Sequence, residues 1–314
     1  MKVLITGGAG FIGSNLARYL LEKGCEVSIF DNFATGKREN LVEIQKQITL
    51  IEGDLRDAGA VARAVEGVDA ISHQGALGSV PRSVEDPVTS HDVNVNGTLN
   101  VLEAMRKTGV KRITFAASSS AYGRHQVSPK SETLTAAPIS PYAASKVACE
   151  AYLQAYSAAY GLEAVGLRYF NIFGPRQDPN GAYAAVIPRF VSALLSGQRP
   201  VVYGDGEQSR DFCYIENACH ANWLGLTTDA KNCDGLPMNI ACNQATSLNQ
   251  ILARLQSLLG TRLEPVYQAE RKGDVKHSLA DIRLAREKIG YEPQILFESG
   301  LDRAIGWYRE KLQG

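Results

Sequence analysis

The sequence predicts an α/β protein built on a doubly wound parallel sheet, with a smaller C-terminal α/β lobe. Short apolar, β-rich runs alternate with segments of helical period through the first two-thirds of the chain. This alternation is typical of a parallel sheet covered by helices on both faces. A glycine-rich turn joins the first predicted strand to the first helix, and the alternation loosens after Asn171. The loosening indicates a second lobe of different organisation.

The elements can be assigned in order along the chain. Strands of the sheet are expected at Lys2–Thr6, Glu26–Phe30, Ile48–Ile51, Ala70–His73, Arg112–Ala117 and Glu163–Arg168. The helices expected between them include Phe11–Glu22, Val93–Arg106 and Ser140–Tyr160. Further helices are expected at Ala185–Ser196, Ile215–Thr227, Leu248–Leu259 and Phe297–Lys311. We therefore divide the chain into a sheet domain, 1–170, and a substrate lobe, 171–314, and leave open that the chain crosses between them more than once.

The composition limits the partners of the protein. Lys plus Arg and Asp plus Glu both number 33, so the net charge is zero. Neither nucleic acid nor an anionic membrane is an expected partner, and an anionic substrate needs a local cluster of cations. No apolar run approaches the ~20 residues that span a bilayer. The six scattered cysteines and the absence of a leader pattern predict a cytoplasmic protein, and the five histidines lack metal-ligand spacing.

The glycine-rich turn predicts a dinucleotide site. Gly8, Gly10 and Gly13 fit the pattern GxGxxG, with Gly7 ahead of it. The turn follows a strand, opens a helix and is followed by Asp31 at the end of the next strand, which is the Rossmann arrangement. Glycines let the backbone approach a pyrophosphate at the positive end of a helix. Asp31 can accept hydrogen bonds from the adenosine ribose and would repel a 2′-phosphate, so NAD is the expected cofactor.

A possible catalytic group begins the helix at Ser140. Tyr142 and Lys146 are four residues apart and therefore share one helix face. A lysine ammonium and a cationic nicotinamide both favour tyrosinate, so we expect the Tyr142 pKa to be depressed toward neutrality. The run Ser118–Ser120 follows a predicted strand, and ligands bind at the carboxyl ends of such strands. One of these hydroxyls can bridge Tyr142 and a substrate hydroxyl.

These motifs occur in the order GGAGFIG, DNF, GDLRD, NVNGT, SSSAYG, YxxxK, LRYFNIFGPRQ and SRDFCYIEN. The chain thereby resembles, over essentially its whole length, the extended short-chain dehydrogenases/reductases of the UDP-galactose 4-epimerase group. HQGALGSVPRS, RQDPNGAYAAVIPRF, GDGEQSRDFCYIEN and GDVKHSLADI are most similar to bacterial UDP-N-acetylglucosamine 4-epimerases. One departure is Gly75, where the family often has Ala after its conserved histidine.

The resemblance implies an NAD-dependent 4-epimerase that interconverts UDP-GlcNAc and UDP-GalNAc, with UDP-Glc and UDP-Gal, through a transient 4-keto sugar. Tyr142 would be the base, Lys146 would orient it, and Ser118 would be the third member, a role that Ser119 or Ser120 could share. The implied cofactor residues are Gly7, Gly10, Phe11, Ile12, Gly13, Asp31, Asn32, Asp54, Leu55, Gln74, Asn94, Tyr142 and Lys146. From the residues alone, Asp54 is equally well explained as a strand-ending turn residue.

The resemblance also implies a UDP-sugar site. Arg210 and Arg271 would hold the diphosphate, because guanidinium groups match phosphate oxygens. Asp274 would bind the uridine ribose, and Tyr203 would lie near the uracil. A serine at 278, where relatives confined to non-acetylated sugars carry Tyr, would leave room for a 2-acetamido group. The implied substrate residues are Ser79, Ser118, Ser119, Ser120, Tyr142, Asn171, Val186, Tyr203, Arg210, Arg271, Asp274 and Ser278.

Several alternatives share this framework. Dehydratases of the superfamily carry Asp-Glu directly after the catalytic threonine, whereas Ser119 and Ser120 stand here, which excludes them. A UDP-N-acetylhexosaminuronate 4-epimerase is the nearest alternative, followed by a uronic-acid decarboxylase. A non-catalytic NAD-binding regulator is more remote, since Tyr142, Lys146 and the serine run are intact. The resemblance further implies a homodimer joined through the helices that begin near Asn94 and Tyr142.

Overall fold

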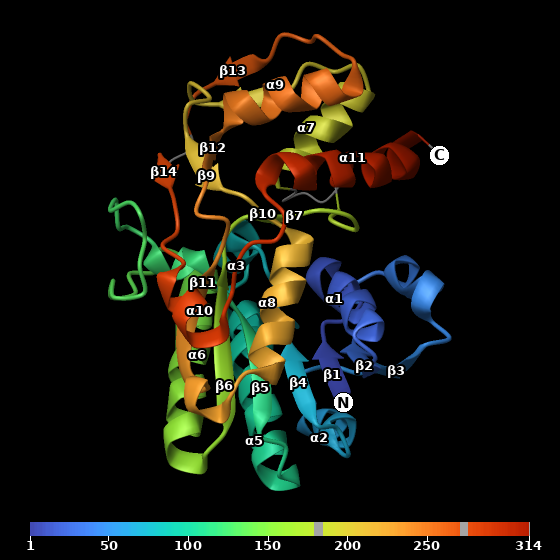
Figure 1. Cartoon of the computed structure of the whole chain (residues 1–314), viewed down its shortest axis with the longest axis vertical. Helices are drawn as coiled ribbons and strands as arrows, with labels where there is room; N and C mark the ends of the chain where they lie inside the picture. Colours follow the sequence, from blue (N-terminus) through green and yellow to red (C-terminus); the bar gives the residue numbers. More distant parts are fainter. Residues whose placement is uncertain (179–184, 271–275, 314) are drawn as a thin grey trace.

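The computed structural model describes residues 1–178, 185–270 and 276–313. Seven parallel strands form one sheet in the order β11-β6-β5-β4-β1-β2-β3 (Figure 1). They are β1 (Lys2–Thr6), β2 (Glu26–Asp31), β3 (Ile48–Glu52), β4 (Ala70–His73), β5 (Arg112–Ser118), β6 (Glu163–Tyr169) and β11 (Asp234–Ile240). The order reverses between β1 and β4, so a crevice forms at their carboxyl ends. The predicted doubly wound sheet is confirmed.

Helices cover both faces of the sheet because its central strands are apolar on both sides. In β1, Leu4 belongs to one buried cluster, whereas Val3 and Ile5 belong to the other. Successive side chains of a strand point to opposite faces, which explains this alternation. One face is covered by α2 (Ala58–Val65), α5 (Gly97–Thr108) and α6 (Pro141–Tyr160), and the other by α1 (Phe11–Glu22) and α8 (Ile215–Thr227).

The helix that follows the crevice differs slightly from its prediction. The expected helix at 93–106 begins as a π-helical segment, η2 (Asp92–Asn96), and continues without a break into α5. Gly109, with φ of 81°, ends it. The shorter helices of this half are η1 (Arg38–Ile44), α3 (Val80–Glu85), α4 (Pro87–His91) and η3 (Ser119–Tyr122).

The C-terminal lobe lies beyond the end of the sheet at which the parallel strands finish (Figure 1). Its strands are β7 (Ile172–Phe173), β8 (Val201–Tyr203), β9 (Ser209–Asp211), β10 (Cys213–Tyr214), β12 (Ala245–Ser247), β13 (Val266–Gln268) and β14 (His277–Ser278). Its helices are α7 (Val186–Leu195), α9 (Leu248–Leu259) and α11 (Phe297–Gln313), with α10 (Arg283–Ile289) and η4 (Ala230–Asn232) beside the sheet. The strands form small sheets, of which β12-β9-β14 is the three-stranded one.

The chain returns from the lobe to the sheet. Strand β11 pairs in parallel with β6, and α8 packs on the central strands. A single boundary at residue 170 therefore leaves β11 and α8, which belong with the sheet, on the lobe side of the division.

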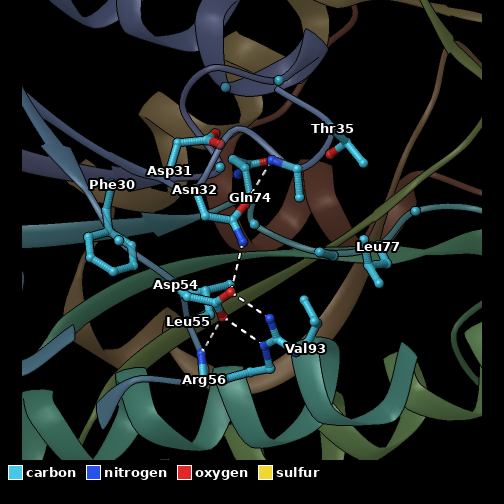
Figure 2. A pocket seen from close by; sticks show the side chains of 18 of the residues that line it. Phe30, Asp31, Asn32, Thr35, Asp54, Leu55, Arg56, Gln74, Leu77 and Val93 are labelled. Carbon is cyan, nitrogen blue, oxygen red and sulfur yellow. Dashed lines mark hydrogen bonds and ion pairs between the residues drawn. The ribbon is translucent and has the colours of Figure 1, made fainter. Parts of the chain in front are cut away.

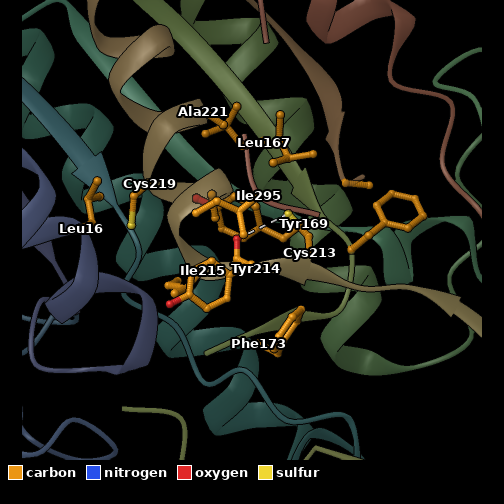
Figure 3. Close-up of a cluster of buried hydrophobic side chains, with 14 of the residues drawn as sticks. Leu16, Leu167, Tyr169, Phe173, Cys213, Tyr214, Ile215, Cys219, Ala221 and Ile295 are labelled. Atoms are coloured by element: carbon orange, nitrogen blue, oxygen red, sulfur yellow. Dashed lines mark hydrogen bonds between the residues drawn. The ribbon is translucent and has the colours of Figure 1, made fainter. Parts of the chain in front are cut away.

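A buried cluster joins the lobe to the sheet (Figure 3). Leu167 of β6 and Leu16 of α1 meet side chains of α8 there, and Phe173 and Tyr214 extend the cluster into the lobe. All six cysteines are buried and unpaired. In the ranges that the structure describes, no helix is both long and apolar enough to cross a membrane.

Candidate active site

The glycine-rich turn packs backbone against backbone. Gly7 has φ of 66°, and a Cβ there would lie 2.6 Å from the Cα of Gly75. A Cβ on Gly13 would lie 2.3 Å from the carbonyl oxygen of Gly7. The Gly75 departure therefore falls at a point where the two crevice turns touch. These close approaches leave no room for side chains, so the turn presents bare backbone at the start of α1.

Beside this turn lies a cavity of about 570 Å³ at the reversal point of the sheet (Figure 2). Its walls include these predicted cofactor residues: Gly7, Gly10, Phe11, Ile12, Gly13, Asp31, Asn32, Asp54, Leu55 and Gln74. Thr35, Arg56, Leu77 and Val93 also line it and were not predicted. Thr35, Arg56 and Leu77 lie in loops or turns, and no sequence motif around them indicates a place in this cavity.

Two carboxylates of this cavity are held in different ways. The oxygens of Asp31 accept the backbone N–H groups of Ala9 at 2.9 Å and Phe33 at 2.8 Å. Burial raises the pKa of Asp31, and these two hydrogen bonds oppose that effect. Asp54 accepts hydrogen bonds from Asn32 and Arg56 (Figure 2), and those from Arg56 hold its pKa well below the usual range. Asp54 is therefore ionised, and its position at the end of β3 puts that charge on the cavity wall.

The residues predicted to be catalytic, Ser118, Tyr142 and Lys146, meet in the walls of a second cavity, of about 840 Å³, which is called the catalytic cavity below. Ser118 ends β5, and its Oγ lies 2.8 Å from the Oγ of Ser120. Tyr142 is in the first turn of α6, where the Ser140 side chain caps the helix. Lys146 is 4% exposed and donates from Nζ to the carbonyl oxygen of Ala116 at 2.7 Å. The lysine thus attaches the base-carrying helix to the strand that ends in the serine run.

The electrostatics of this group differ in part from the expectation. Burial raises the pKa of Tyr142, and a hydrogen bond with Ser118 only partly offsets that. The depression toward neutrality was predicted with a cationic nicotinamide beside Tyr142; in the chain by itself, desolvation of the phenolate outweighs the favourable contacts. Burial also lowers the pKa of Lys146, to about 8.

Two predicted residues, Asn94 and Ser79, form hydrogen bonds with neighbouring residues instead of lining a cavity. Asn94 accepts the N–H of Leu77 at 2.8 Å and donates to the hydroxyl of Ser145 at 3.0 Å, so it ties the crevice loop to α6. The Ser79 hydroxyl accepts the N–H of Arg82 and caps α3. Neither residue is among the described residues that line the dinucleotide cavity, the catalytic cavity or a third cavity in the lobe, described next. Gly78, next to Ser79, lines all three of these cavities.

The lobe supplies a third cavity, of about 550 Å³. The predicted residues Asn171, Val186, Tyr203 and Arg210 line it. Ser278 lines the catalytic cavity and pairs with Arg210 in strand register, so these two residues lie side by side.

Three further residues bear on the substrate site: Arg271 and Asp274, which were predicted, and Lys130, which was not. Arg271 and Asp274 lie outside the described residues. Lys130, 3% exposed, also lines the catalytic cavity and was not predicted. It stands in a loop and is brought in by pairing with Ala280, which sequence distance conceals.

The residues present fit a dinucleotide. A bare-backbone turn opens a helix beside a carboxylate, and the cavity continues into the catalytic one, since both are lined by Phe11, Ile12 and Gln74. Residues 3–241 match the sequence model of the NAD dependent epimerase/dehydratase family. The chain belongs to this family. Its members depend on NAD, so the cofactor is NAD, and the expected resemblance to this superfamily is confirmed.

UDP-sugar 4-epimerases are among the solved structures of high similarity. One is a UDP-N-acetylglucosamine 4-epimerase from Methanobrevibacter ruminantium in complex with UDP-N-acetylmuramic acid: 40% identity, TM-score 0.93, covering 99% of this chain and 98% of that chain. A UDP-glucose 4-epimerase of Thermotoga maritima with UDP-glucose has 37% identity, TM-score 0.93 and coverages of 99% and 100%. A UDP-glucose 4-epimerase of Thermus thermophilus with NAD has 37% identity, TM-score 0.87 and coverages of 98% and 99%.

Proposed function

We propose that this UDP-sugar 4-epimerase interconverts UDP-N-acetylglucosamine and UDP-N-acetylgalactosamine, and accepts UDP-glucose and UDP-galactose in the same site. The observation that carries the proposal is that the three cavities share their walls. The dinucleotide and catalytic cavities share Gln74, and the catalytic and lobe cavities share Asn171 and Arg210. A nucleotide sugar laid along them has its sugar beside Tyr142 and its diphosphate within reach of Arg210.

The side chains have complementary tasks in this reaction. Tyr142, hydrogen-bonded to Ser118, takes the proton of the sugar 4-hydroxyl, and Lys146 holds a positive charge one helical turn away. The dinucleotide cavity, with the glycine turn and Asp31 in its walls, would hold NAD, which would supply the hydride acceptor and donor for C4. Epimerisation also requires the sugar to turn over while the nucleotide stays in place. Small residues around the sugar, Ala117, Ser120 and Ser278, leave space for that turn and for a 2-acetamido group.

The charges of the catalytic cavity favour epimerisation over dehydration. No aspartate or glutamate lines this cavity in the described ranges, 1–178, 185–270 and 276–313. Removal of water across C5–C6 needs an acid–base pair in addition to the tyrosine. The cations Lys130 and Arg210 stand there instead, and the buried ammonium of Lys130 supports a uronic acid, with its C6 carboxylate, as the second candidate substrate.

A direct assay tests the proposal. The purified NAD-loaded protein is incubated separately with UDP-GlcNAc, UDP-GalNAc, UDP-Glc, UDP-Gal and the uronic acids UDP-GlcNAcA and UDP-GlcA, and 4-epimers are quantified by ion-pair chromatography. We expect the acetamido pair to be turned over at least as well as the plain hexoses, and Tyr142→Phe to be inactive. Faster turnover of a uronic acid would favour the second candidate, and the absence of any 4-epimer would overturn the function.

We further propose that the protein acts in the cytoplasm as a homodimer joined through α5 and α6. Exposed tyrosines on α6, Tyr152 at 39% and Tyr160 at 54%, would be covered in such a dimer. Light scattering coupled to gel filtration should give twice the 34.0 kDa chain mass, and Tyr152→Glu should halve it. A monomeric wild type would contradict this assembly.

A further inference from the structure

Helix α6 carries a third ionisable residue one turn beyond Lys146, which the proposed chemistry does not use. Glu150 is 3% exposed and faces Arg168 on β6, which is 5% exposed. Nε of Arg168 donates to Oε1 of Glu150 at 2.9 Å, and Nη2 donates to Oε2 at 2.7 Å. A buried ion pair is weak evidence for stability, because desolvation of both charges offsets their attraction. A role in the geometry of the site is therefore worth testing.

The other side of the Arg168 guanidinium faces the serine turn. Its Cζ lies 4.8 Å from the centre of the Tyr122 ring, and Tyr122 closes the turn η3 that begins at Ser119. Nη1 of Arg168 is buried and has no hydrogen-bond partner among the described residues. One guanidinium therefore contacts both the helix of the base and the turn of the serines.

The strand register places this contact close to the reacting groups. Arg168 pairs with Ala117, and the next pair along the strands joins Tyr169 to Ser118. Lys146 binds the carbonyl oxygen of Ala116 on the same strand, β5. Residues four apart lie on one helix face. Helix α6 is thus attached to the sheet at two points, Lys146 on β5 and Glu150 on β6.

We propose that Glu150 and Arg168 are positioning residues for the reaction. The pair fixes α6 against β6 and the serine turn, and so holds Tyr142 at its distance from Ser118. The Glu150 carboxylate also supplies negative charge beside the Lys146 ammonium. The proposal rests on the proposed function only through the roles of Tyr142 and Lys146, and it is independent of which sugar is turned over.

The charge of Glu150 has a measurable consequence. Burial lowers the pKa of Lys146, and the charge of Glu150 opposes this effect. His73 on β4 also faces Lys146, but burial lowers its pKa to about 3, and burial raises the pKa of Cys149. Both are therefore neutral near pH 7, as is the Tyr142 phenol of the chain alone. Removing the Glu150 charge should lower the Lys146 pKa further, so the ammonium form should be lost at lower pH.

The test uses three variants of the NAD-loaded protein. Glu150→Gln removes the charge and keeps the shape. The double variant Glu150→Met with Arg168→Met replaces the ion pair by apolar side chains, an exchange that folds commonly tolerate. Glu163→Gln is the control, because the Arg112–Glu163 pair, at 2.6 Å, is also an ion pair of β6 but joins it to β5, at the end of the strand far from Arg168. Turnover, KM and the pH profile are measured with whichever UDP-sugar the wild type accepts.

A second measurement needs no substrate. With ¹³Cε-labelled lysine, the Lys146 resonance is assigned by its loss in Lys146→Arg, and its titration midpoint is followed by NMR. We expect kcat to fall roughly 10- to 100-fold in both pair variants, the scale of a misplaced catalytic group, with KM nearly unchanged. The Lys146 midpoint, and with it the pH above which kcat/KM stops rising, should move to lower pH in both. The control variant Glu163→Gln should retain the wild-type kcat, the Lys146 titration midpoint and the pH profile.

Three results would overturn the proposal. One is a double variant with wild-type kcat and an unchanged Lys146 midpoint. The second is an equal loss of kcat in Glu163→Gln, because that would indicate general strand packing. The third is a Lys146 midpoint unmoved in Glu150→Gln. A wild type that epimerises no UDP-sugar would refute the proposed function, while the NMR titration would still decide the relation between Glu150 and Lys146.

Discussion

Gly13 is the position at which helix α1 touches the turn of the dinucleotide cavity, and its replacement by alanine tests that site. A Cβ there would lie 2.3 Å from the carbonyl oxygen of Gly7 and 2.7 Å from the Cα of Gly8. Ordinary contact begins at 3.4 Å, so the overlap with Gly7 exceeds 1 Å. Both neighbours are backbone atoms, so no side-chain rotation can relieve the overlap. The turn itself must move.

The expected magnitude follows from this overlap. Added volume in a close-packed site costs ~1–3 kcal/mol. Gly13 lies within α1, where alanine would otherwise be favoured by up to ~1 kcal/mol, so global stability should change little. The displacement falls on the backbone that must approach the pyrophosphate. We therefore expect the Kd for NAD to rise roughly 10- to 100-fold, at about 1.4 kcal/mol per factor of ten.

NAD content of the purified variant and the Kd by calorimetry measure this effect. Gly306→Ala is the control, because a Cβ at that helical glycine would meet nothing within 4 Å. Gly306→Ala should bind NAD like the wild type. A Gly13→Ala protein that also binds NAD within twofold of wild type would refute the account of the turn.

Three further predictions concern the chemistry. Tyr142→Phe should keep NAD and the fold but lose at least ~10²-fold in kcat, as for a positioned acid–base group, and near-normal turnover would exclude this tyrosine as the base. Ser278→Tyr should shift selectivity roughly tenfold or more against UDP-GlcNAc by steric exclusion, and equal losses on UDP-Glc would argue against that wall. Because burial raises the pKa of Tyr142, whose deprotonated form is the base, kcat/KM should rise with pH; the rise should end as Lys146, with a pKa of about 8, loses its proton, because the loss of ammonium then cancels the gain in tyrosinate. A kcat/KM that keeps rising above that pH would contradict the role of the Lys146 ammonium.

Local pattern was sufficient to predict most of the sheet. The first six strands are short apolar runs between helical segments, and each lies within one residue of its expected bounds. Strand β11 was missed because its sequence, DGLPMNI, contains both Gly and Pro and follows lobe segments. Its pairing with β6 depends on contacts far apart in the sequence. Helix α2, only eight residues long, was likewise not assigned.

The candidate site was predictable where one local motif holds it. The glycine turn and the Tyr142–Lys146 spacing are of this kind, and the structure brings both to one crevice. Lys130 reaches the same cavity through a bridge to Ala280, and no pattern around it indicates that contact. The rise of the Tyr142 pKa in the chain alone could not be predicted for a similar reason, because desolvation depends on the surrounding fold. The Glu150–Arg168 pair joins a helix to a strand and is visible only in three dimensions.

We infer that this protein removes the C4 hydrogen of a UDP-sugar and returns it to the opposite face of the same molecule. UDP-N-acetylglucosamine deuterated at C4, incubated with the NAD-loaded protein in ordinary water, tests this most directly. We expect the product, UDP-N-acetylgalactosamine, to retain its deuterium at C4, and no NADH to remain. Product that has exchanged its C4 deuterium for solvent hydrogen, or NADH formed in proportion to the sugar consumed, would contradict it.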